Sequence, residues 1–208
     1  MPDSRADRRR QLESQAEAAA TCTRCDLYRR ATQTVFGEGE VGAGILLVGE
    51  QPGDREDIDG HPFVGPAGAL LDGVLADAGI GPDDVYVTNA VKHFKWEGRG
   101  KRRIHKKPSA TEVQACNVWL EQEIRLVEPR VVVCLGVTAA RAVLGRPTTI
   151  SSVRGQVLEG PGDTLVVVTV HPSAVLRARD SEERSAMRGG LVADLALARD
   201  AAASRTGG

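Results

Sequence analysis

Four short runs of apolar residues recur along the chain, and each is continuous rather than alternating with polar residues. They lie at residues 45–48, 85–88, 131–135 and 165–170. Strands that are buried on both faces of a parallel sheet have this pattern, whereas strands with one exposed face alternate. The runs therefore predict a central sheet of four mainly parallel strands.

Segments with helical periodicity separate these runs. Helices are expected at residues 66–78, 109–127, 138–144 and 181–198. The second of them begins with the capping-box pattern of Ser109 and Glu112. Strands that alternate with helices are typical of a doubly wound domain, so we expect a three-layer α/β/α architecture.

A length of 208 residues suffices for about one compact domain. We expect residues 21–200 to form it, with residues 1–20 as an N-terminal helix or tail and residues 201–208 as a disordered tail. No apolar run approaches the roughly 20 residues that a membrane-spanning helix needs, and the Arg-rich N-terminus does not resemble a secretory signal. The expectation is a monomeric, cytoplasmic protein with no membrane partner.

The chain has four cysteines, Cys22, Cys25, Cys116 and Cys134. Disulfides are disfavoured because nothing indicates secretion. The Cys-x-x-Cys spacing of the first pair lets two thiolates reach one metal centre, and the other pair could complete the ligands of a zinc ion or an iron–sulfur cluster. The alternative is an isolated Cys-x-x-Cys pair with two core cysteines, since Cys134 lies inside an apolar run. The spacing leaves both interpretations open.

Ligands of doubly wound sheets bind at the carboxyl ends of the strands. The first run is followed by a glycine- and proline-rich turn, Gly49 to Asp54, whose backbone can approach a ligand closely. A loop with Phe63 comes next, Asn89 follows the second run, and His171 follows the fourth. Each residue also has a purely structural interpretation, as a turn, a loop anchor, a cap or a packed histidine. Because these residues all lie at the carboxyl edge of the predicted sheet, we expect the chemistry at that edge.

Residues 92–107 hold eight Lys and Arg residues and one acidic residue, Glu97, although the whole chain has a formal net charge of −1. Phe94, Trp96 and two histidines are interleaved with them. Cations bind phosphates and aromatic rings stack on bases, so this composition favours a nucleic-acid contact. A solvated charged loop is the alternative.

Four motifs, taken together, resemble the uracil-DNA glycosylase superfamily. They are GEQPG at residues 49–53, PFVGPAG at 62–68, TNAVKHF at 88–94 and HPS at 171–173. The cysteines match the ligand pattern of the iron–sulfur glycosylases of family 4, and the similarity runs from about residue 22 to about residue 195. The resemblance implies a [4Fe–4S] cluster ligated by Cys22, Cys25, Cys116 and Cys134.

Two features depart from ordinary family 4 members, which usually carry a small residue at the position of Gln51 and lack the insertion KRRIH at residues 101–105. Both features mark the X-type glycosylases, which become covalently attached to uracil-containing DNA. The resemblance thus implies excision of uracil followed by linkage of His105 to the anomeric carbon of the deoxyribose. The alternatives are a conventional turnover glycosylase and a non-catalytic, cluster-bearing DNA-binding protein.

The resemblance also implies roles for single residues. Phe63 is expected to stack on uracil, Asn89 to hydrogen-bond to its edge, and His171 to stabilise negative charge on the leaving base. Glu50 is expected to orient His105 or to accept its proton.

The remaining implied contacts are with the substrate, uracil-containing DNA in single-stranded or duplex form. Gln51 is expected to contact either the base or the loop that carries the nucleophilic histidine. Further substrate-binding residues are expected to be Gly49, Asp54, Arg103 and Ser173, and contacts to the DNA backbone are expected from Lys92, Lys101, Arg102 and Lys106.

Overall fold

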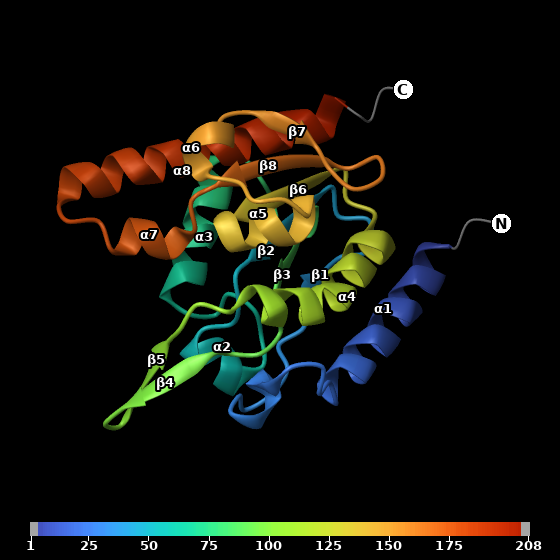
Figure 1. Ribbon diagram of the computed structural model, residues 1–208. Coiled ribbons are helices and arrows are strands. Elements are labelled where there is room, and N and C mark those ends of the chain that lie inside the picture. The colour runs from blue at the N-terminus through green and yellow to red at the C-terminus, as the bar shows by residue number, and fades with distance from the viewer. Residues whose placement is uncertain (1–3, 205–208) are drawn as a thin grey trace.

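Six strands form the central sheet of the computed structural model, which describes residues 4–204 (Figure 1). In spatial order they are β1 (Glu38–Gly39), β3 (Val85–Asn89), β2 (Ile45–Gly49), β6 (Val131–Leu135), β8 (Leu165–Thr169) and β7 (Val157–Glu159). The inner four pair in parallel, whereas the two edge strands are antiparallel to their neighbours. The predicted parallel strands are confirmed, and the structure adds the two short edges.

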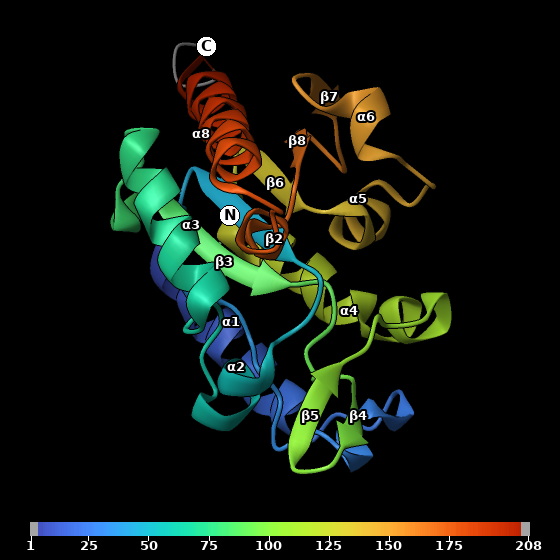
Figure 2. The same ribbon diagram turned by 90° about the vertical axis from the view of Figure 1, so that its left-hand side faces the viewer.

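Helices cover both faces of the sheet, and this explains why the inner strands are apolar throughout. In β2, Leu46 and Val48 join one buried cluster, while Ile45 and Leu47 join the other. One layer contains α1 (Arg5–Ala20), α4 (Ala110–Val127) and α5 (Val137–Leu144), and the other contains α3 (Pro66–Asp77) and α8 (Ser181–Ser204) (Figure 2). The predicted three-layer α/β/α fold is confirmed.

Short helical turns complete the fold. They are η1 (Asp26–Arg29), α2 (Asp54–Asp59), η2 (Pro82–Asp84), α6 (Ile150–Val153) and α7 (Pro172–Leu176). The capping box predicted for α4 is present, because the Ser109 hydroxyl accepts from the Glu112 N–H at 3.2 Å while the Ser109 N–H donates to the Glu112 carboxylate at 2.5 Å.

The basic segment is a β-hairpin rather than the expected loop. Strands β4 (Trp96–Arg99) and β5 (Arg102–His105) pair antiparallel and project from the body of the fold beside α2 (Figure 2). The register pairs Trp96 with His105. His105 therefore lies at the base of the hairpin, next to the carboxyl edge of the sheet, and not at its tip.

The two ends of the described chain are helical. Leu12 of α1 is buried in the same cluster as Leu120 of α4, so α1 packs on the body of the fold. Helix α8 continues to Ser204 and buries Ala202, so the tail predicted to begin at residue 201 is wrong for residues 201–204. Residues 205–208 lie outside the described part of the chain. Among the described helices, none has the length and hydropathy to span a membrane.

Two helical glycines should respond to alanine with opposite signs. A Cβ on Gly68 would lie 1.5 Å from the carbonyl oxygen of Phe63, whereas a Cβ on Gly189 of α8 would meet no atom within 4 Å. Gly68→Ala should therefore destabilise the fold by about 1–3 kcal/mol through overpacking. Gly189→Ala should stabilise it by about 0.4–1 kcal/mol. Urea denaturation of both variants measures the two effects, and a Gly68→Ala variant as stable as the wild type would contradict the close packing of α3 on Phe63.

Candidate active site

A cavity of about 760 Å³ opens at the carboxyl edge of the sheet. Its lining comes from the ends of the four parallel strands and the segments that follow them: Glu50 to Gly53 after β2, Asn89 at the end of β3, Gly136 and Val137 after β6, and Val170, His171 and Ser173 after β8. Phe63, His105, Lys107 and Arg177 complete much of the wall. The carboxyl edge is thus hollowed where the sequence places the candidate residues.

One wall carries His171 in a defined tautomer. The backbone N–H of Ser173 donates to Nδ1 of His171 at 3.1 Å, so the proton of the neutral ring is on Nε2. Burial lowers the pKa of His171 to about 4, with further lowering by the charge of Arg177. The ring is therefore a neutral N–H donor at neutral pH. Ser173 orients this histidine and also lines the cavity, and its expected contact with substrate stays a prediction.

Phe63 and Asn89 approach each other across a glycine. The Phe63 ring stacks on His171 with a centroid distance of 6.2 Å and an interplanar angle of 22°. A Cβ on Gly49 would lie 2.2 Å from Oδ1 of Asn89 and 2.8 Å from Cζ of Phe63. Gly49 therefore acts by leaving room: only a residue without a side chain lets the amide and the ring come this close.

His105 faces the cavity from the base of the hairpin. Its side chain is 50% exposed, and Nε2 lies 3.7 Å from Oε1 of Glu50. The other carboxylate oxygen of Glu50 accepts a hydrogen bond from the hydroxyl of Thr138, which fixes the carboxylate. Desolvation at the cavity wall, together with the charge of Arg177, lowers the pKa of His105 although Glu50 opposes the shift. The ring is therefore uncharged at neutral pH.

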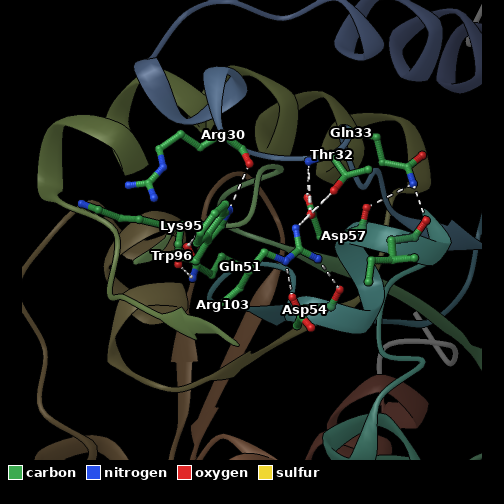
Figure 3. Close-up of polar contacts among 10 residues, drawn as sticks. Arg30, Thr32, Gln33, Gln51, Asp54, Asp57, Lys95, Trp96 and Arg103 are labelled. Atoms are coloured by element: carbon green, nitrogen blue, oxygen red, sulfur yellow. Dashed lines mark hydrogen bonds and ion pairs between the residues drawn. The ribbon is translucent and has the colours of Figure 1, made fainter. Parts of the chain in front are cut away.

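Gln51 fastens the base of the hairpin to the end of β2. Its amide nitrogen donates to the carbonyl oxygen of Lys95 at 3.2 Å, and its amide oxygen accepts from the N–H of Lys95 at 3.2 Å (Figure 3). The same amide nitrogen also donates to the carbonyl oxygen of Lys106 at 3.1 Å. Of the two roles that the sequence left open, the described structure has the contact with the histidine-bearing segment. These bonds hold the two chain segments at the base of the hairpin, where His105 lies.

Arg103 fastens the middle of the hairpin to α2. Its guanidinium group lies 2.5 Å from a carboxylate oxygen of Asp54 and 2.5 Å from one of Asp57, and it donates to Oγ1 of Thr32 at 3.2 Å (Figure 3). Neither Arg103 nor Asp54 lines the cavity. Arg103 and Asp54 bind each other and hold the hairpin, and their expected contact with substrate stays a prediction.

A second contact ties the hairpin to the segment after the Cys-x-x-Cys turn. The indole N–H of Trp96 donates to the carbonyl oxygen of Arg30 at 3.0 Å, and the Arg30 guanidinium group lies 4.4 Å from the centroid of the Trp96 ring (Figure 3). The hairpin is therefore bound to Arg30, which follows Cys22, Cys25 and η1 in the chain.

The predicted phosphate-binding cations divide into two groups. Lys101, Arg102 and Lys106 are exposed on or beside the hairpin. Lys92 is only 1% exposed and forms an ion pair with Glu123 at 2.5 Å. The prediction that Lys92 contacts the DNA backbone is wrong, because no phosphate can reach a fully buried ammonium group.

Three of the four cysteines lie near one another. Burial raises the pKa of Cys25 and of Cys116, and the nearby cysteines raise both further: Cys22 acts on Cys25, and Cys22 and Cys25 act on Cys116. Two N–H groups point at their sulfur atoms: the indole N–H of Trp119 at Cys22 (3.3 Å) and the backbone N–H of Lys92 at Cys116 (3.2 Å). Within residues 4–204, however, no three His, Cys, Asp or Glu side chains converge in the arrangement of a metal site.

Cys134 stands apart from the other cysteines. It lies inside β6 between Val48 and Val168, and its side chain belongs to the core cluster of α4 and α5. Cys25 and Cys116 pack in a different cluster. The prediction of Cys134 as a fourth ligand is therefore corrected: a side chain in the middle of the sheet packs as core.

Sequence reasoning missed four residues near the site. His93 is buried, and its Nε2 lies 3.0 Å from the hydroxyl of Thr34. That hydroxyl also donates to the carbonyl oxygen of Ala19, just before the segment Cys22–Cys25, which we call the cysteine turn. Burial lowers the pKa of His93, so this imidazole is neutral. The others are Thr138, Lys107 and Arg177. A search that admits histidine as a metal ligand would have included His93. It directly follows Lys92, whose backbone N–H donates to Sγ of Cys116.

Comparison with known proteins gives a consistent set of similarities. The family model described as the uracil DNA glycosylase superfamily matches residues 36–196. Over 174 residues the chain is 38% identical to the type-4 uracil-DNA glycosylase of Thermotoga maritima, covering 83% of this chain and 87% of that protein. It is 35% identical to the type-4 enzyme of Pyrobaculum aerophilum (89% and 92% covered) and 39% identical to that of Archaeoglobus fulgidus (75% and 78% covered).

The pKa values of His171 and His61 should be shifted in opposite directions from the ordinary value for histidine. His171 should stay neutral until about pH 4, because its buried ring is desolvated. His61 should protonate above the ordinary value of 6.5, because Glu38 accepts a hydrogen bond from its ring. Imidazole NMR shifts followed from about pH 8 to about pH 3 measure both. Protonation of His171 near 6.5 would contradict its burial and the assigned tautomer.

Proposed function

The chain belongs to the uracil DNA glycosylase superfamily, and we propose that it excises uracil from DNA and is then linked covalently through His105 to the deoxyribose left behind. The observation that carries this proposal is the presence of two neutral imidazoles, His171 and His105, on the wall of one cavity. One is arranged to donate a proton in a hydrogen bond, and the other is free to act as a nucleophile.

Uracil must leave the base stack before it can enter such a cavity. Phe63 supplies a ring on which a planar base stacks, and Asn89 supplies an amide that can donate and accept at the base edge. The narrow space over Gly49 brings these two groups to adjacent sides of the same base.

His171 is suited to the bond-breaking step. When the glycosidic bond breaks, its electron pair leaves with uracil and negative charge develops on a carbonyl oxygen of the base. The Nε2–H of His171 would donate a hydrogen bond to that oxygen. A preorganised donor that bears no charge stabilises the developing anion without having to be reorganised.

His105 is suited to the capture step. The departing base leaves an electrophilic anomeric carbon, and a ring nitrogen of His105 would donate its lone pair to form a carbon–nitrogen bond. The positive charge that the ring acquires lies close to the carboxylate of Glu50, which is 3.7 Å from Nε2 before reaction. An imidazole attached to carbon is a poor leaving group, so the protein would stop after one turnover.

The hairpin contacts support capture by His105 rather than by water. Gln51 binds the residues just before β4 and just after β5, and Arg103 anchors the middle of the hairpin to Asp54 and Asp57. A nucleophile held on a rigid element has a high effective concentration at the anomeric carbon. The exposed cations Lys101, Arg102, Lys106 and Lys107 would hold the phosphates of the same strand.

A [4Fe–4S] cluster is the cofactor that this proposal includes. Cys22, Cys25 and Cys116 supply three thiols, and those of Cys22 and Cys116 already receive N–H donors, as cluster sulfur ligands do. His93, the residue after Lys92, is a buried neutral imidazole that we include as the fourth ligand. Glycosidic cleavage transfers no electrons, so the cluster would tie the cysteine turn to α4. The segment that follows the cysteine turn supports the hairpin through the hydrogen bond between Trp96 and Arg30.

Removal of the nucleophile should convert trapping into turnover. His105→Ser should abolish the adduct that survives denaturing electrophoresis with uracil-containing single-stranded DNA, while uracil is still released because water can occupy the vacated space. Ile104→Ser is the matched control, since neighbouring residues of β5 point to opposite faces. Peptide mapping should place the sugar on His105 of the wild type. An adduct that persists in His105→Ser would remove this histidine from the reaction, and free abasic product from the wild type would indicate a conventional turnover enzyme.

Substitution of single ligands should separate the cluster cysteines from the core cysteine. Cys116→Ser and His93→Ala should lose the brown colour and the bound iron of anaerobically purified protein, whereas Cys134→Ala should keep both. Iron analysis and the visible absorption spectrum measure the difference. Loss of iron in Cys134→Ala with its retention in His93→Ala would reverse the ligand assignment.

A further inference from the structure

Lys92 and Glu123 form an ion pair in the interior of the protein. Their side chains are 1% and 0% exposed, and Nζ lies 2.5 Å from Oε2. Removal of two charges from water is costly, and such a pair is tolerated only when further hydrogen bonds satisfy both groups. The pair joins β3 and its following turn to α4, so it connects two of the segments that form the proposed sites.

Both charged groups are satisfied by neighbours. The carboxylate of Glu123 accepts from the Gly37 N–H at 2.9 Å, from the Thr88 hydroxyl at 2.9 Å and from the Tyr86 hydroxyl at 3.3 Å. The ammonium group of Lys92 donates to the Thr88 hydroxyl at 2.5 Å and to the backbone carbonyl oxygen of Asn89 at 2.9 Å. The contact with Asn89 is a direct bond to the residue proposed to hydrogen-bond to the base.

Lys92 also touches the proposed cluster segment. Its backbone N–H donates to Sγ of Cys116 at 3.2 Å. Cys116 and Glu123 are two turns apart on α4 and are both buried, so they lie on one face of that helix. One residue therefore contacts the thiol of Cys116 through its backbone and the carbonyl oxygen of Asn89 through its side chain.

We propose that Lys92 and Glu123 are positioning residues that hold Asn89 in place for uracil recognition. Asn89 is the last residue of β3, and the N–H groups of Ala90 and Val91 after it still donate to the carbonyl oxygens of Gly49 and Glu50. The carbonyl oxygen of Asn89 itself is bound by the ammonium group of Lys92, and Glu123 fixes Lys92 to α4. This inference rests on the proposed function, because it assigns the pair to Asn89 as the base-reading residue.

The test uses Lys92→Met/Glu123→Gln, which removes both charges together and leaves no isolated charge in the core. With uracil-containing DNA under single-turnover conditions, the reaction should slow by about tenfold or more, whereas the affinity for the same DNA without uracil should be unchanged. Tyr86→Phe is the matched control: it removes one hydrogen bond to Glu123 but leaves Lys92 on Asn89, and it should react at about the wild-type rate.

A double-mutant cycle separates positioning from a general loss of structure. If the pair acts through Asn89, the same double substitution in the Asn89→Ala background should have almost no further effect on the rate, since coupled residues are not additive. A full additional effect in that background would overturn the proposal.

Hydrogen exchange supplies a readout that does not depend on the reaction. The backbone amides of residues 89–91 should exchange faster in Lys92→Met/Glu123→Gln than in the wild type or in Tyr86→Phe. Unchanged exchange there would overturn the positioning role even if the wild type reacts with uracil. A wild type that leaves uracil-containing DNA intact would instead overturn the proposed function. The exchange rates would still decide whether Lys92 and Glu123 hold Asn89 in place.

Discussion

The parallel pairing of β3, β2, β6 and β8 is the constraint on which the rest of the structure depends. Parallel neighbours cannot be joined by tight turns, so each strand is followed by a crossover that passes over one face of the sheet. The four carboxyl ends consequently meet at one edge, and the polar residues that follow them line a single cavity. Because helices cover both faces, this edge is where irregular backbone is free to carry functional groups.

Two buried carboxylates, Asp57 and Glu123, and the partly buried carboxylate of Glu50 hold the irregular segments in place around that edge. Asp57 receives the backbone and the hydroxyl of Thr32 as well as the guanidinium group of Arg103. Glu123 receives donors from β3 and from the segment before β1, and Glu50 receives the hydroxyl of Thr138. A carboxylate without such donors would be strongly disfavoured inside the protein, so each of these groups fixes several segments at once. The hairpin with His105 and the strand end with Asn89 owe their positions to these contacts.

Charge and residue type, taken by themselves, did not reveal the surroundings of particular residues. Lys92 and Arg103 belong to a segment rich in cations, yet one is buried on Glu123 and the other is bound by two aspartates. Cys134 completes a set of four cysteines by number, yet it lies within the sheet core. The partners of Lys92 and Arg103 come from far along the chain, so the local sequence contains no sign of them. The apolar run around Cys134, in contrast, already favoured a core position.

The sequence by itself determined the parallel strands, the main helices and the edge of the sheet at which Glu50, Asn89 and His171 gather. These follow from local periodicity and from the rule that ligands bind at carboxyl ends, and neither depends on distant contacts. Only the tertiary structure decided that Gln51 binds the hairpin, that His93 lies beside the cysteine turn, and that His105 faces the cavity from the base of a hairpin. Such outcomes depend on desolvation and on hydrogen bonds between segments that are remote in sequence, and both exist only once the chain has folded.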